Sequence, residues 1–111
     1  MAINGVNGVT DVNKAIVNAV KTGKVILGSK STIDATRVGK AKLIILASNC
    51  PSNVREDIEY YARLSQIPIY VYHGNSIDLG EICGKVFTVA AMAVREPGDS
   101  EILKLAEESN V

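Results

Sequence analysis

The order of apolar and polar segments is the feature that most constrains the fold of this chain. A short apolar run at residues 25–27 leads into the polar loop 28–32 and then into a segment with helical spacing. A second apolar run at residues 43–46 leads into the polar loop 47–51 and another helical segment. Strands that alternate with helices are typical of α/β folds, in which ligands gather beyond the carboxyl ends of the strands. The sequence therefore predicts an α/β domain whose two polar loops share one sheet edge.

The spacing of apolar residues predicts four strands and five helices. The strand at residues 42–47 is expected to be central, because its apolar residues are continuous and both faces must be covered. In the third helix, Asn53 and Glu56 have the spacing of a capping box, and the tyrosines of this helix are expected in the core. The expected helices lie at about 11–22, 31–38, 52–65, 76–83 and from 99 or 100 onward, and the expected strands at 24–27, 42–47, 69–72 and 86–94.

A length of 111 residues suits a single domain, residues 1–111, with residues 1–9 as a loose N-terminal lead-in. The apolar runs are far shorter than a membrane span, and the N-terminus lacks the basic and apolar regions of a signal peptide. We therefore expect a cytosolic protein.

Charge is distributed unevenly along a chain whose formal net charge is zero. Residues 1–50 hold seven lysines and arginines against two acids, a balance of +5, whereas residues 51–111 hold five against ten, a balance of −5. The zero net charge argues against a nucleic-acid partner, but this asymmetry predicts one basic face and one acidic face.

The loop Gly28–Thr32 combines a glycine, three hydroxyl residues and Lys30 at the start of a predicted helix. Glycine allows close backbone approach, and the free N–H groups at a helix N-terminus favour an anion such as phosphate. The hydroxyls also suit simple helix capping, so both interpretations stay open. The loop matches neither the lysine-containing phosphate loop nor the glycine-rich dinucleotide fingerprint, so a nucleotide is not the expected ligand.

An enzymatic interpretation would need a nucleophile, and Cys50 is the candidate. Cysteine-dependent phosphatases place an arginine six positions after the cysteine, whereas Arg55 follows Cys50 by five, and Pro51 occupies the loop where N–H groups should converge. Cys50 and Cys83 are too far apart for a CxxC pair, and His73, the single histidine, lies in a turn signal. The sequence therefore predicts no catalytic group, metal site or cofactor.

Phe87 is the single phenylalanine of the chain and follows Gly84-Lys85-Val86. A core position is the default for such a residue. An aromatic side chain at the start of a strand, beside a lysine, can also stack on an unpaired RNA base. That role requires the strand to begin at the edge where the two earlier strands end, and so requires a mixed sheet with an antiparallel fourth strand.

Several short motifs, taken together and in order along most of the chain, resemble one family. They are Thr22-Gly23-Lys24, Gly28-Ser29-Lys30-Ser31-Thr32, Ala41-Lys42-Leu43-Ile44-Ile45, Glu59-Tyr60-Tyr61-Ala62, Leu79-Gly80, Gly84-Lys85 and Gly98-Asp99-Ser100. This set resembles the archaeal and eukaryotic L-thirty-e family of large-subunit ribosomal proteins, within the kink-turn RNA-binding superfamily. The resemblance implies a three-layer α/β/α sandwich with a mixed four-stranded sheet. It also implies a non-enzymatic constituent of the large ribosomal subunit that binds a kink-turn in rRNA, contacts neighbouring ribosomal proteins and is monomeric when free.

The same resemblance assigns the RNA contacts to three loops. It places the kinked backbone against the glycine, lysine and serine of the first loop, a base or sugar edge against Asn49, and an extruded base against Val86 and Phe87. The full set of expected contacts is Gly28, Ser29, Lys30, Ser31, Asn49, Gly84, Lys85, Val86 and Phe87.

Two positions separate branches of this superfamily. Lys30 and Ser31 stand where the L-seven-Ae branch has asparagine and glutamate, which favours the L-thirty-e branch. Thr88 stands where some relatives carry a basic residue, so no phosphate contact is assigned to it. The alternative function is a small phosphate-handling enzyme that uses the Gly28–Thr32 loop and Cys50.

Overall fold

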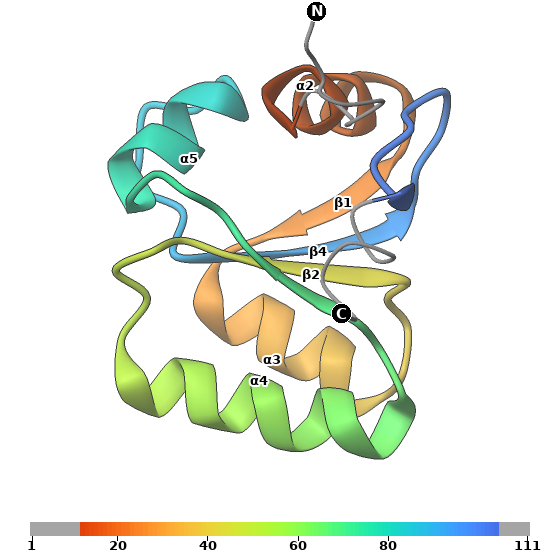
Figure 1. Cartoon of the computed structure of the whole chain (residues 1–111), viewed down its shortest axis with the longest axis vertical. Coiled ribbons are helices and arrows are strands. Elements are labelled where there is room, and N and C mark those ends of the chain that lie inside the picture. The colour runs from red at the N-terminus through yellow and green to blue at the C-terminus, as the bar shows by residue number, and fades with distance from the viewer. Residues whose placement is uncertain (1–11, 105–111) are drawn as a thin grey trace, which may run out of the picture.

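A computed structural model describes residues 12–104, which form a sheet with helices on both faces (Figure 1). In chain order the elements are α2 (Val12–Thr22), β1 (Lys24–Leu27), α3 (Ser29–Arg37), β2 (Leu43–Leu46), α4 (Ser52–Ser65), β3 (Ile69–Val71), α5 (Ser76–Ile82) and β4 (Ala91–Glu96). The predicted alternation of helices and strands is confirmed.

The four-stranded sheet is mixed and has the strand order β1-β4-β2-β3. β2 and β3 are parallel, whereas β4 runs antiparallel to both β1 and β2. β1, β2 and β3 therefore share one direction, and β4 begins at the edge where β1 and β2 end. This is the antiparallel fourth strand that an RNA-stacking role for Phe87 requires.

The core has two parts, one on each face of the sheet. Helices α2 and α5 cover one face, and α3 and α4 cover the other (Figure 1). The side chains of β2 alternate between them, with Leu43 and Ile45 in the first cluster and Ile44 and Leu46 in the second. All four are fully buried, so β2 is the central, doubly covered strand that the sequence predicts. The result is a three-layer α/β/α sandwich.

Two predicted boundaries next to the polar loops are wrong. α3 begins at Ser29 instead of near Ser31, because Gly28 itself is the N-cap residue. β4 begins at Ala91 instead of Val86, and residues 86–90 form a loop. The apolar residues of this loop imitate a strand in sequence, but Val89 N donates to the carbonyl of Ser76 at the start of α5, at 3.0 Å, and not to another strand.

The prediction of a capping box at the start of α4 is wrong. α4 has Pro51 as its N-cap and no side-chain cap, so Asn53 and Glu56 are ordinary residues of its first turns. The capping box is formed instead at the start of α5, where the Asn75 side chain accepts from the N–H of Asp78 and the Asp78 carboxylate accepts from the N–H of Asn75. α5 is the helix on which the candidate site depends, as described below.

The tyrosines of α4 are not core residues, contrary to the prediction. Tyr60 is 56% exposed, Tyr61 is half-buried, and their rings meet edge to face. Beyond β4, Ile102 is buried in the cluster beneath α2 and α5. The predicted last helix does not begin at residue 99 or 100, because residues 99–103 are turns and irregular backbone. Its continuation beyond residue 104 and the N-terminal lead-in lie outside the described residues. Within residues 12–104, no helix has the length and apolar character needed to cross a membrane.

Candidate nucleic-acid interface

Three loops meet where β1 and β2 end and β4 begins, at the left of Figure 1. Backbone hydrogen bonds hold them together, because Gly28 N donates to the carbonyl of Ala91 and Ala47 N donates to the carbonyl of Ala90, both at 2.9 Å. We call this end of the sheet the loop edge. The nine predicted contact residues lie in these loops or in the first turn of α3, so segments far apart in the sequence are brought to one end of the molecule.

Gly28 lies at the turn from β1 into α3 with a φ of 110°, a backbone conformation that favours glycine. A Cβ atom added there would meet nothing within 4 Å, so the backbone is open to a ligand. No side chain caps α3, contrary to the capping role considered for the loop hydroxyls. The first N–H groups of α3 therefore lack acceptors within the helix, and the exposed Lys30 and Ser31 lie beside them.

Asn49 is exposed on the second loop, and its side chain has one structural partner. The Oδ1 atom accepts a hydrogen bond from Ser76 N at 2.8 Å. One residue earlier, Ser48 N donates to the carbonyl of Gly74 at 2.9 Å. Asn49 thus ties the end of β2 to the start of α5, which leaves its amide Nδ2 as the group that can donate to a ligand.

The third loop is packed against α5 at both ends. Lys85 N donates to the carbonyl of Gly80 at 3.0 Å, with Gly84 at a φ of 75°, and this arrangement ends the helix. A Cβ atom added at Gly80 would overlap the carbonyl oxygen of Phe87. Gly80 therefore sets how closely the loop approaches α5. The sequence alone did not predict this packing role, although a glycine inside a predicted helix is a signal of close packing.

The tip of the third loop presents apolar side chains to solvent. Val86 is fully exposed and Phe87 is 57% exposed, and neither belongs to the two core clusters. The default core position for Phe87 is therefore wrong. Adjacent exposed apolar side chains beside a basic loop are typical of a surface that binds a partner.

The sequence profile that matches this chain is that of the ribosomal protein L7Ae/L30e/S12e/Gadd45 family, over residues 10–104. The chain belongs to this family. The match spans every helix and strand described above, including the three loops of the loop edge. Membership of the L7Ae/L30e family confirms the resemblance inferred from the short motifs.

Three curated proteins similar to this chain come from archaea. A protein of Methanothermobacter thermautotrophicus named large ribosomal subunit protein eL30 is 54% identical over 95 residues, which cover 86% of this chain and 97% of the relative. Proteins with the same name from Methanosphaera stadtmanae and Methanocaldococcus jannaschii are 50% and 54% identical. They cover 87% of this chain each and 99% and 88% of their own lengths. These names describe ribosomal proteins and not enzymes.

The two cysteines of this L7Ae/L30e family member are buried thiols. Burial raises the pKa of Cys50, and the positive charge of Arg55 offsets only part of that increase. Burial likewise raises the pKa of Cys83 to about 11. His73 is exposed, and residues 12–104 contain no cluster of histidine, cysteine and acidic side chains that could hold a metal ion. Cys50 therefore lacks the lowered pKa that a phosphatase nucleophile needs.

Native Cys83 should resist alkylation. A pKa of about 11 instead of about 9 lowers the thiolate fraction at pH 8 roughly 100-fold, so iodoacetamide should modify Cys83 at least that much more slowly than in the urea-unfolded chain. Cys50 should also be protected, and mass spectrometry of peptides from quenched samples measures both sites. Fast modification of native Cys50 would revive the enzymatic alternative.

Proposed function

We propose that this protein is a structural constituent of the large ribosomal subunit in the cytoplasm and binds a kink-turn in rRNA through the loop edge. The observation that carries the proposal is the convergence of the α3 N-terminus, Asn49 and the exposed Val86-Phe87 tip on one end of the sheet. The names of the archaeal relatives support the ribosomal role. Its partners are then rRNA and neighbouring ribosomal proteins, and the free protein is a monomer.

Each loop offers a different chemistry to bent RNA. The open N–H groups of α3, together with Lys30, suit phosphates that crowd together in a kink. The Nδ2 group of Asn49 can donate to a base edge or a sugar hydroxyl. Phe87 offers a ring face to a base that the kink has unstacked, and Val86 extends the apolar surface. The phosphate, hydrogen-bond and stacking contacts can form at the same time only with an RNA whose backbone is kinked and whose base is unstacked.

The direct test compares two RNAs of equal length and strand composition in a gel shift at one salt concentration. One carries a kink-turn and the other is a straight duplex. The kink-turn RNA should bind at least tenfold more tightly, because the contacts at the loop edge depend on backbone shape and an extruded base. Equal binding of the two RNAs would refute recognition of the kink.

Asn49 allows its two roles to be separated. Asn49→Asp keeps an oxygen that accepts from Ser76 N, and a carboxylate near the start of α5 is electrostatically favourable, so the melting temperature should change little. The same change removes the Nδ2 donor and places a negative charge against RNA. A neutral hydrogen bond contributes about 0.5–1.5 kcal/mol, and repulsion between the new carboxylate and the phosphates adds to its loss, so kink-turn affinity should fall roughly tenfold or more.

Asn49→Ala is the matched variant, because it removes both the acceptor and the donor. It should lower the melting temperature as well as RNA affinity. If Asn49→Asp binds the kink-turn RNA as tightly as the unchanged protein, Asn49 serves only to hold α5 in place.

A further inference from the structure

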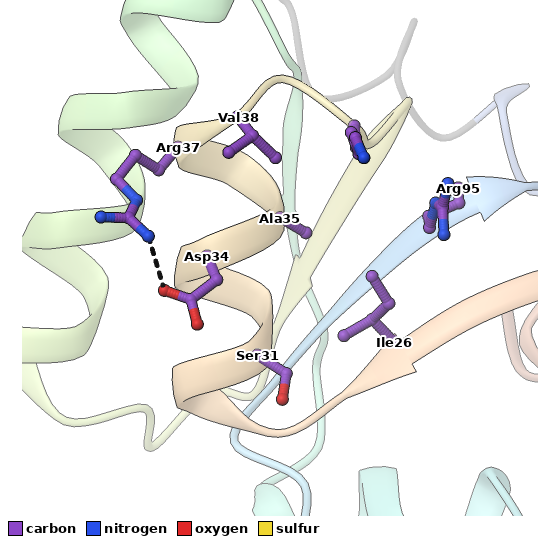
Figure 2. A pocket seen from close by; sticks show the side chains of 8 residues that line it. Ile26, Ser31, Asp34, Ala35, Arg37, Val38 and Arg95 are labelled. Atoms are coloured by element: carbon purple, nitrogen blue, oxygen red, sulfur yellow. Dashed lines mark hydrogen bonds and ion pairs between the residues drawn. The ribbon is translucent and has the colours of Figure 1, made fainter.

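A second basic surface runs between α3 and the strands β1 and β4, from Ser31 near the loop edge to Lys24 and Glu96 at the opposite end of the sheet. Two neighbouring cavities, of about 390 and 330 Å³, share Lys40 and Arg95 in their linings. Figure 2 shows the larger one, with Arg95 and Ile26 on adjacent strands opposite Ala35 of α3. The smaller one adds Lys24, where β1 begins. We call the two cavities together the α3 groove.

A β-bulge directs side chains into this groove. Residues of β1 and β4 pair regularly from Leu27 with Met92 to Val25 with Val94, but Lys24 then pairs with Glu96. Arg95 is therefore an extra residue in β4. The side chain of Val94 faces the α2 and α5 layer, so Arg95 takes the α3 side, and the bulge brings Glu96 to that side as well. An uninterrupted strand would have placed these two neighbours on opposite faces.

The end of α3 holds Lys40 in position. Its backbone N–H donates to the carbonyl of Ala35 at 2.9 Å, and Gly39 N donates to the carbonyl of Thr36 at 3.1 Å, with Gly39 at a φ of 72°. This is the paired hydrogen-bond pattern of a Schellman motif. The backbone at Lys40 is therefore anchored, and this exposed residue lines both cavities.

The groove carries more positive charge than the chain as a whole. Its linings contain five cationic side chains and two carboxylates, a formal charge of +3 in a chain whose net charge is zero. Both carboxylates are already paired, Asp34 with Arg37 at 3.3 Å and Glu96 with Lys42 at 3.2 Å. Within residues 12–104, the other three cations have no salt-bridge partner: Lys24, Lys40 and Arg95.

We propose that the α3 groove binds the phosphate backbone of a second RNA segment through Lys24, Lys40 and Arg95, which lie at the end of the groove away from the loop edge. Its lining supplies cations but no aromatic side chain, which suits phosphates and not stacked bases. β4 spans about 17 Å from Ala91 at the loop edge to Glu96 in the groove. The protein therefore holds two stretches of RNA backbone at once. The partner's identity as RNA rests on the proposed function, whereas the groove's charge does not.

The test uses the double variant Lys40→Gln/Arg95→Gln and two RNA probes in fluorescence anisotropy. The first probe is a straight RNA duplex at about 50 mM salt, to which the groove should bind without any kink. The variant should bind the duplex roughly tenfold or more weakly than the unchanged protein. The slope of log affinity against log salt concentration should become shallower by about 2, because two cations no longer contact phosphates. The second probe is a minimal kink-turn RNA with short arms, to which the variant should bind within about twofold of the unchanged protein.

The matched control is Lys21→Gln/Arg63→Gln, which removes two exposed cations from α2 and α4 and should leave duplex binding unchanged. Unchanged duplex affinity in the groove variant would overturn the proposal. An acidic protein surface would then be the partner that fits the charge of the groove. Equal loss of duplex binding in Phe87→Ala would also overturn it, because one surface would then explain both activities. Failure of the proposed function is seen separately, as equal binding of kinked and straight RNA by the unchanged protein.

Discussion

Replacing Phe87 with alanine should weaken binding of kink-turn RNA by about 1–3 kcal/mol while leaving the melting temperature nearly unchanged. The energy is that usually lost when an aromatic side chain stops stacking on a base. Truncation of a buried phenylalanine would instead reduce stability by about 3–5 kcal/mol. Phe87 is 57% exposed at the tip of a loop and belongs to neither core cluster, so the fold loses little when its ring is removed.

Tyr60→Ala is a matched control for this variant. Tyr60 is also aromatic and 56% exposed, but it lies on α4, outside the three loops. Its removal should leave RNA affinity unchanged. Thermal unfolding and anisotropy titrations with the kink-turn RNA measure both quantities for each variant. Severe unfolding of Phe87→Ala, with normal affinity of the fraction that remains folded, would contradict the stacking role.

Gly80→Ala should weaken binding of kink-turn RNA although Gly80 is buried and lies beneath the loop. The new methyl group would overlap the carbonyl oxygen of Phe87, so the loop backbone must move away from α5. Overpacking of this kind reduces the free energy of unfolding by about 1–3 kcal/mol. Because Val86 and Phe87 move with the loop, kink-turn affinity of the folded protein should also fall, roughly tenfold or more.

Gly23→Ala separates the steric effect from the functional one. A Cβ atom at Gly23 would overlap the carbonyl oxygen of Glu96, at the opposite end of the sheet from the loop edge. This variant should lose comparable stability but retain its affinity for kink-turn RNA at a temperature where both variants are folded. If Gly80→Ala binds the RNA normally, the loop can adapt and its packing against α5 does not control recognition.

The parts of the fold that the sequence predicts best are those with a continuous or periodic apolar pattern. α2 buries Ala15, Ile16 and Ala19 on one face, and this spacing is visible without a structure. The uninterrupted run of β2 predicts a strand covered on both faces. In both cases neighbouring residues alone determine the outcome, because burial follows directly from the period of the element.

The parts that the sequence predicts poorly depend on contacts between distant segments. Val86 and Phe87 have the composition of a strand, but Gly80 and Ser76 hold this segment as a loop on α5. The structural partner of Asn49 is a backbone N–H 27 residues away, and nothing in the local sequence marks it. No single loop predicts that the three loops converge. That prediction depends on the family resemblance and on an antiparallel fourth strand.

The position of β4 in the sheet has a consequence for how the chain folds during its own synthesis. β4 is the last strand to be made, yet it lies between β1 and β2 and provides the only strand pairing of β1 within residues 12–104. A nascent chain that ends before residue 91 therefore lacks the strand that joins β1 to β2. Such pairing between residues distant in sequence slows folding. The loop edge, which depends on hydrogen bonds to Ala90 and Ala91, is consequently assembled only after most of the chain has left the translating ribosome.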